Sequence, residues 1–127
     1  MMKICDFGVS KYFTSDEKFY EKCGTPAYIA PEILKKEGYR GEISDIWSVG
    51  MVLYLLIYGT LPFSSLDIND ITEYITKKKI NFPDEISVEL RDFFEKSLNI
   101  NPHERFNAYS LLHHPWIKTS DEKSILN

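Results

Sequence analysis

No charged residue occurs between Ile46 and Leu66, and this run constrains the fold more than any other feature of the chain. Such a length can cross a membrane as a helix. Its second half, however, holds Gly59, Pro62 and two serines, which predict a turn. The apolar half, Val49 to Tyr58, spans only about 15 Å as a helix. A short helix that is apolar on every side is typical of the centre of a globular core, so we expect no membrane partner.

Composition narrows the class of protein. The chain has 127 residues, which fits one domain, and its 43% hydrophobic and 27% charged residues are ordinary globular values. A net charge of −4 without a basic block argues against nucleic acid as a partner. Cys5 and Cys23 form no CxxC motif, so neither a disulfide framework nor a cysteine zinc site is expected. Free thiols and the lack of an apolar leader predict an intracellular protein of the cytoplasm or nucleus.

The pattern of apolar residues and helix caps predicts a mainly α fold, with one strand, one long loop and about five helices. The expected elements are a strand at 2–5, a loop at 9–29, a short helix from Pro31 to Lys36, a helix capped by Ser44 and ending at Tyr58, a helix capped by Asp67 or Asn69 and ending before Lys77, a helix carrying Leu90, Phe93, Phe94 and Leu98, and a last helix from Ala108 to His113. The polar tail at 118–127 is expected to fray.

The triplet Asp6-Phe7-Gly8 follows the predicted strand and is the first motif with clear chemistry. A carboxylate in such a turn can hold Mg²⁺ against ATP phosphates, while the Phe packs inward and the Gly lets the backbone turn. On its own the triplet also fits an ordinary acidic turn. The two neighbouring histidines, His113 and His114, have no third metal ligand nearby in the sequence, which argues against a metal site there.

Three further motifs follow in order. They are Ala30-Pro31-Glu32 preceded by Gly24-Thr25-Pro26, then Asp45-Ile46-Trp47-Ser48-Val49-Gly50, and finally Arg105 within Asn101-Pro102-His103-Glu104-Arg105. With the first triplet, they make the chain resemble the eukaryotic protein kinases from Lys3 to Trp116. The resemblance implies a partial kinase domain at 1–117, with an activation segment at 6–32 and a helical subdomain at 33–117. It corresponds to the C-lobe of a kinase, and the N-lobe is absent from the sequence.

The resemblance also implies a role for each motif. Asp6 would be a metal ligand, and Asp6, Phe7 and Gly8 would face the ATP and Mg²⁺ of the parent enzyme. Gly24, Thr25 and Pro26 would contact the protein substrate. Glu32 and Arg105 would form a buried ion pair that ties the end of the activation segment to the last helices. Asp45 would accept backbone N–H groups of the catalytic loop, and Trp47 would belong to the central helix.

Finer detail points to a subgroup. Gly24-Thr25-Pro26 is similar to the serine/threonine kinases, and His114-Pro115-Trp116-Ile117 to the calcium/calmodulin-regulated and calcium-dependent groups. Many kinases carry an activating phosphothreonine at the position of Glu21. We expect the carboxylate of Glu21 to replace that phosphate in the parent enzyme. Thr14 and Ser15 are further candidate regulatory sites.

The sequence also departs from the family. It contains no G-x-G-x-x-G loop, no phosphate-pairing lysine in a Val-Ala-Ile-Lys setting and no His-Arg-Asp catalytic loop, so no catalytic residue is assigned in this chain. We therefore expect the chain alone to be inactive as a kinase. Its expected partners are protein substrates or regulators and the missing N-terminal part of the kinase. The alternative is a non-catalytic, kinase-like interaction module that uses the predicted helix at 67–76.

Overall fold

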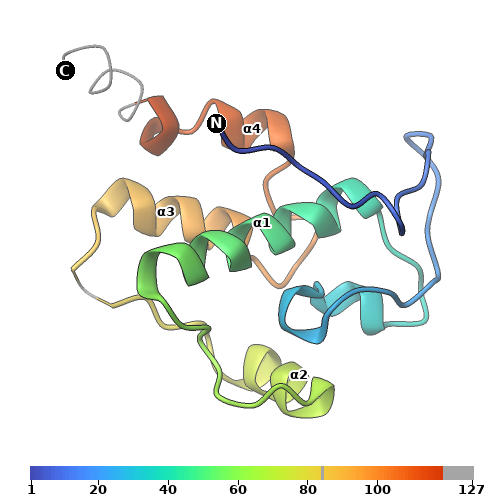
Figure 1. Ribbon diagram of the computed structural model, residues 1–127, viewed down its shortest axis with the longest axis horizontal. Coiled ribbons are helices and arrows are strands. Elements are labelled where there is room, and N and C mark those ends of the chain that lie inside the picture. The colour runs from blue at the N-terminus through green and yellow to red at the C-terminus, as the bar shows by residue number, and fades with distance from the viewer. Residues whose placement is uncertain (84, 119–127) are drawn as a thin grey trace.

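A computed structural model describes residues 1–83 and 85–118. In these residues the chain forms two short 3-10 helices and four α-helices, and a long irregular segment precedes them (Figure 1). The elements are η1 (Pro26–Tyr28), η2 (Pro31–Leu34), α1 (Gly41–Tyr58), α2 (Ile68–Lys77), α3 (Val88–Ser97) and α4 (Ala108–Leu112). The mainly α fold class is confirmed. The short helix expected to reach Lys36 is a 3-10 turn that ends at Leu34.

The central helix α1 begins earlier than the sequence predicted. It starts at Gly41 instead of after Ser44, because the hydroxyl of Ser44 is buried and donates a 2.8 Å hydrogen bond to Glu32. A side chain committed to a tertiary partner cannot cap its own helix. The C-terminal end lies where it was expected. Gly59 adopts a left-handed conformation with φ of 72°, and its N–H donates to Leu55 O at 2.8 Å.

The other helices carry the caps that their sequences favour. Asp67, not Asn69, caps α2 and accepts from the backbone N–H groups of Asn69 and Asp70. The side chain of Ser87 accepts from Leu90 N at the start of α3, and Asn107 does the same for Ser110 N in α4. Helix α4 ends at Leu112, one residue before the predicted end. Side-chain oxygens thus fix three of the four helix starts.

The core lies between α1 and the elements around it. Trp47 and Met51 of α1 are fully buried, and so is Phe94 of α3. The ring of Phe94 stacks on Phe82 with centroids 5.1 Å apart, and the hydroxyl of Tyr54 donates to Asn81 O at 3.1 Å. Two helices, η1 and α4, also contact α1. Helix α1 is therefore the hub of the fold, as Figure 1 shows.

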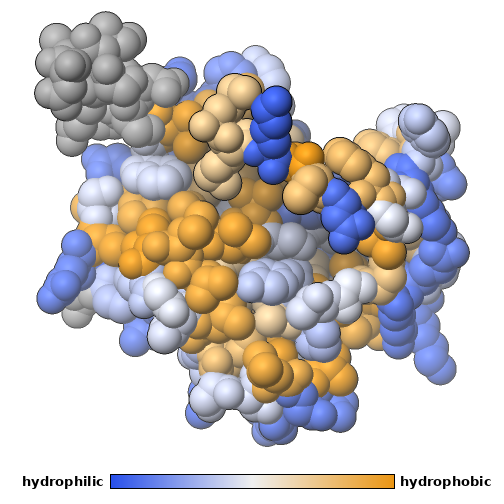
Figure 2. Space-filling view, viewed as in Figure 1, coloured by the Kyte–Doolittle hydropathy of each residue, from blue (hydrophilic) through white to orange (hydrophobic). Residues whose placement is uncertain are grey.

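One face of α1 is not covered, although the sequence predicted burial on every side. Val49, Val52 and Leu56 lie at helical spacing and are 49%, 42% and 65% exposed. Figure 2 shows an apolar patch over α1 on this face of the molecule. By length and composition alone α1 would also qualify as a membrane span, with a mean hydropathy of 1.2 over 18 residues. Core helices of soluble proteins have the same length and composition.

The predicted strand at 2–5 is wrong. These residues are exposed and have no ladder partner among the residues described. A strand exists only where another backbone pairs with it. The described residues hold a single isolated bridge instead, between Phe19 and Tyr39. Of the predicted tail, residues 119–127 lie outside the part of the chain that the structure describes.

Candidate functional site

The irregular segment before η1 curves past the beginning of α1 and leaves an open cleft of about 540 Å³. Residues from the segment at 6–32 and from α1 line this cleft together. Among them are Phe7, Glu21, Gly24, Thr25, Glu42, Asp45 and Ser48. The fold thus brings several sequence-predicted site residues to one place. Asp6, Thr14, Ser15, Glu32 and Arg105 do not line it.

The Asp6-Phe7-Gly8 turn is exposed. Asp6 adopts a left-handed conformation with φ of 62°, and its Oδ1 accepts from Gly8 N at 3.3 Å. Asp tolerates this conformation because its short side chain can bond to the nearby backbone. The expectation that Phe7 packs inward is wrong, since its side chain is 67% exposed. The turn is shaped in part by the hydrogen bond from Gly8 N to Asp6 and by the one from Ser10 N to Phe7 O at 3.1 Å.

The described residues do not by themselves form a multi-ligand metal centre. The described residues contain no cluster of three or more His, Cys, Asp or Glu side chains that could hold a metal ion. Asp6 is an exposed carboxylate, and Mg²⁺ bound to a nucleotide takes one or two protein carboxylates together with phosphate and water oxygens. The two neighbouring histidines, His113 and His114, have other hydrogen-bond partners. His113 Nδ1 lies 2.8 Å from Tyr109 O, and His114 Nε2 lies 3.0 Å from Asp92 Oδ2.

The predicted contact between Glu32 and Arg105 is present in the structure. The guanidinium donates from both terminal nitrogens to the two carboxylate oxygens, at 2.5 and 2.9 Å, and both side chains are buried. Remaining donors of Arg105 reach the carbonyl oxygens of Asn99 at 2.9 Å and Ile43 at 3.1 Å. A fork-to-fork pair of this kind is strong and directional. It joins residues that lie 73 positions apart in the sequence.

The environment keeps Glu32 ionised. Burial alone pushes its pKa upward, but the hydrogen bond and positive charge of Arg105 outweigh burial and hold the pKa below its ordinary value. The hydroxyl of Ser44 adds a further hydrogen bond in the same direction. The carboxylate therefore has donors on both oxygens, which is the condition for a buried charge to be tolerated.

Helix α1 also contacts Arg105 and the η1 turn. The guanidinium of Arg105 lies 5.3 Å from the centre of the Trp47 ring, a cation–π contact. At the next residue of α1, the Ser48 hydroxyl donates to Tyr28 O at 2.8 Å. The indole N–H of Trp47 is buried and has no hydrogen-bond partner among the described residues. Trp47 therefore acts through packing.

The Gly24-Thr25-Pro26 stretch is held at the edge of the cleft. Gly24 has φ of 118°, a conformation that other residues rarely adopt. Thr25 is extended and exposed, its carbonyl accepts from Tyr28 N at 3.0 Å, and its hydroxyl makes no capping bond. Pro26 then begins η1. The hydroxyl of Thr25 is thus presented at a cleft, on a backbone that the neighbouring turns fix.

Asp45 lies on the α1 side of the cleft. Burial, and next to it the negative charge of Glu42, raise the pKa of Asp45 above its ordinary value. The structure shows no hydrogen bond to its carboxylate from the residues described. Asp45 is exposed, so its carboxylate remains open to solvent at the edge of the cleft.

The three candidate regulatory residues are all exposed. Thr14 belongs to a turn in which Glu17 N donates to its carbonyl at 3.0 Å, and Ser15 is the next residue of that turn. The Glu21 carboxylate pairs with Lys11. Sequence reasoning missed Tyr39, whose hydroxyl donates to Glu21 O at 2.7 Å. The available signal was the aromatic residue between the glycines Gly38 and Gly41, which suit close contact with another segment.

Comparison with known proteins places these motifs in a family. The protein kinase domain matches residues 1–117. CBL-interacting protein kinase 5 of Oryza sativa subsp. japonica is 35% identical over 98% of this chain and 28% of its own length. Myosin light chain kinase A of Dictyostelium discoideum is 38% identical, over 98% and 43%. Calcium-dependent protein kinase 2 of Oryza sativa subsp. japonica is 39% identical, over 95% and 24%.

These matches cover nearly all of the chain and less than half of each relative. They include serine/threonine kinases and a calcium-dependent kinase, which confirms the resemblance drawn from the motifs. The mainly helical structure agrees with the C-lobe of such a kinase. The chain belongs to the eukaryotic protein kinase family and is related to the serine/threonine kinases of its calcium-regulated group.

Proposed function

We propose that this chain is the substrate-facing helical part of a serine/threonine kinase that transfers the γ-phosphoryl group of Mg-ATP to Ser or Thr of protein substrates. The observation that carries the proposal is the buried pair of Glu32 with Arg105. This ion pair and the hydrogen bond from the Ser48 hydroxyl to Tyr28 O attach the residues after Thr25 to α1. Thr25 itself then lines the cleft. Such rigid positioning is what phosphoryl transfer requires of a protein.

The proposal includes inactivity of the chain alone. Within this sequence only Asp6 stands where the family has a metal ligand, and the groups that would hold the nucleotide phosphates are absent from it. One exposed carboxylate cannot position a nucleotide. Activity would require the N-terminal part of a kinase. We also propose a reducing intracellular location, in keeping with the free and exposed thiols of Cys5 and Cys23.

A chimera tests the proposal. Residues 3–117 would replace the matching segment of myosin light chain kinase A, and phosphate transfer from labelled Mg-ATP to a Ser-containing peptide would be measured. We expect the chimera to be active and the isolated chain to give no transfer. The Thr25→Ala chimera should fold normally, because only the hydroxyl and one methyl group are removed at an exposed position. It should lose most of its activity, because the proposed role of Thr25 requires the hydroxyl.

Two controls make the result interpretable. Exposed Thr76 lies on α2, away from the cleft, and Thr76→Ala should leave the activity of the chimera unchanged. Circular dichroism would show whether each chimera is folded. A folded but inactive chimera with Thr25 intact would refute the kinase proposal, and transfer by the isolated chain would refute the predicted inactivity.

The alternative, a non-catalytic interaction module, has one observation in its favour. A second open cleft, of about 840 Å³, lies between the turn after α1 and helix α2, lined by Leu61, Pro62, Phe63, Tyr74 and Lys77 among others. The genomic reading frame distinguishes the two functions. An in-frame phosphate-pairing lysine and His-Arg-Asp motif upstream of Met1 would favour the enzyme, and a stop codon there would favour the module.

A further inference from the structure

The middle of the activation segment is attached to the loop that precedes α1 at one place. Phe19 N donates to Tyr39 O at 2.8 Å and Tyr39 N donates to Phe19 O at 2.9 Å, which is a pair of antiparallel bridge bonds. The Tyr39 hydroxyl then reaches further along the segment and donates to the backbone carbonyl of Glu21 at 2.7 Å. We call this set of contacts the Tyr39 clamp. It makes three hydrogen bonds across two segments.

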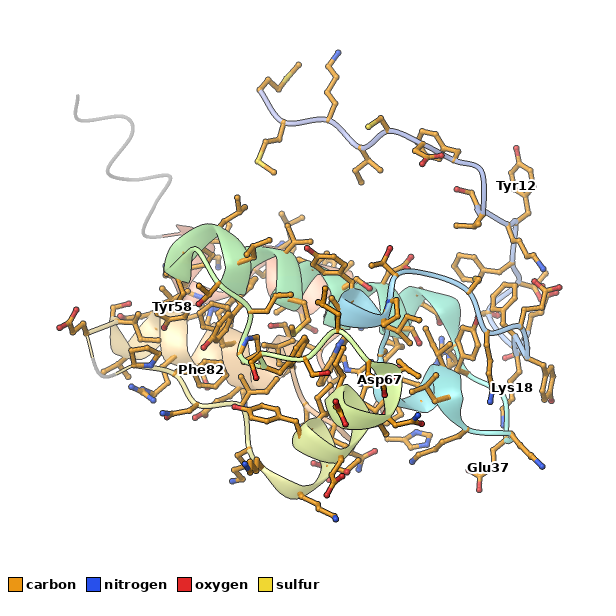
Figure 3. All side chains as sticks on the ribbon, turned by 60° about the horizontal axis from the view of Figure 1, so that its bottom comes forward. Tyr12, Lys18, Glu37, Tyr58, Asp67 and Phe82 are labelled. Atoms are coloured by element: carbon orange, nitrogen blue, oxygen red, sulfur yellow. The ribbon has the colours of Figure 1, made fainter. Side chains whose placement is uncertain are left out.

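Two glycines allow the segments to approach so closely. A Cβ on Gly38 would lie 2.8 Å from Cε1 of the Tyr20 ring, and one on Gly41 would lie 3.1 Å from the Phe19 ring. Lys18 also touches this loop, since its Cβ lies 3.3 Å from the same point on Gly38. In Figure 3, Lys18 and Glu37 are labelled near one another at this edge of the molecule.

The carboxylate of Glu21 has a weaker role in this arrangement. It pairs with Lys11, and the two side chains are 66% and 47% exposed. Exposed pairs of this kind are screened by water and contribute little order. Tyr39 bonds instead to the main chain of Glu21, so its bond is independent of the charge at that position. Burial, followed by electrostatic repulsion from Cys23, Glu21 and Asp45, raises the pKa of Tyr39, so its hydroxyl remains a donor at neutral pH.

We propose that Tyr39 is the positioning residue that orders the activation segment of this protein without phosphorylation, through its bond to the Glu21 backbone. The benefit to substrate binding rests on the proposed kinase function, but the ordering itself does not. This mechanism competes with the sequence-based hypothesis that the charge of Glu21 replaces a phosphate. The two differ in a measurable way, because one requires a hydroxyl on residue 39 and the other a carboxylate on residue 21.

Limited proteolysis of the full chain with trypsin tests the proposal. Lys18 and Lys22 flank the clamp and are exposed, so cleavage after them reports how often the segment opens. Tyr39→Phe removes the hydroxyl and keeps the ring. We expect it to speed cleavage after both lysines by about threefold to tenfold, as loss of one net hydrogen bond implies. Glu21→Gln keeps the backbone carbonyl, and we expect it to change cleavage less than twofold.

Cleavage after Arg91 and Lys96, within α3, should stay slow in both variants and serves as the internal control for the intact fold. If the Glu21→Gln variant were cleaved as fast as the Tyr39→Phe variant, or faster, the proposal would be overturned in favour of the charge. Unchanged cleavage in the Tyr39→Phe variant would also overturn it. Neither result depends on phosphate transfer, so failure of the clamp and failure of the kinase proposal remain distinguishable.

In the active chimera, Tyr39→Phe should raise KM for the peptide more than it lowers kcat.

Discussion

Glu32 is a single carboxylate on which two distant parts of the chain converge. Its oxygens accept from Arg105 and Ser44, so η2, the first turns of α1 and the loop before α4 meet at one buried charge. A buried ion pair is weak evidence for net stability, because both partners lose their hydration. Removing one partner is strongly destabilising, because it leaves the other side chain charged and buried without a counter-charge.

Arg105→Leu should therefore destabilise the protein strongly. We expect the free energy of unfolding to fall by about 3–5 kcal/mol, measured by urea denaturation followed by circular dichroism. The matched control is Lys77→Leu, which breaks the exposed pair with Glu73 and should cost less than about 1 kcal/mol. A loss below about 1 kcal/mol for Arg105→Leu would show that the pair does not hold the fold together.

The lowered pKa of Glu32 also predicts a dependence of stability on pH. A group whose pKa is lower in the folded state stabilises the fold above its ordinary pKa of 4.5 and loses that effect as pH falls through the folded value. Unfolding free energy should thus decline below about pH 4.5, and Glu32→Gln should flatten this decline. Asp45, whose pKa is raised, acts in the opposite direction, so the comparison must be made between variant and parent. Equal slopes for the two proteins would contradict the prediction.

At the scale of elements, sequence patterns predicted what local chemistry controls. Asp67 caps α2 and Gly59 ends α1, because a short polar side chain and a left-handed glycine act within a few residues. The start of α1 was missed because Ser44 binds Glu32, 12 positions away. Tyr39 was missed for the same reason, since its partner lies 18 positions away and the signal in the sequence was only a pair of glycines.

Contact between α1 and α3 depends on Gly50. A Cβ at this position would lie 2.7 Å from Cδ2 of Leu98 and 2.8 Å from Oγ of Ser97. Gly50→Ala should therefore cost about 1–3 kcal/mol of unfolding free energy through overpacking, despite the better helix propensity of Ala. Thermal unfolding would measure it. Gly50→Ser should cost at least as much, and stabilisation by either substitution would mean that the two helices can move apart freely.

At the scale of the whole molecule, the uncovered face of α1 is the main departure from a self-contained domain. The sequence predicted a helix apolar on all sides, and the structure covers only part of its surface. The chain spans 24% to 43% of the relatives compared above, so those proteins have further residues outside the matched segment. An apolar pattern in the sequence indicates a helix suited to burial, whereas its exposure in the structure depends on which segments pack against it.

This face predicts the behaviour of the purified chain. Val49, Val52 and Leu56 form a stripe that should bind a hydrophobic dye such as ANS and promote self-association, measured by light scattering. The double variant Val52→Ser with Leu56→Ser removes two exposed apolar side chains. It should reduce dye binding at least twofold while changing unfolding free energy by less than about 1 kcal/mol, because neither residue is buried in the core.

The matched control is Val88→Ser, which alters an equally apolar and 80% exposed residue outside this stripe, at the start of α3. A parent chain that is monomeric, unfolds cooperatively and binds no dye would contradict the prediction, and would mean that the stripe is too small or too well hydrated to act as an interface.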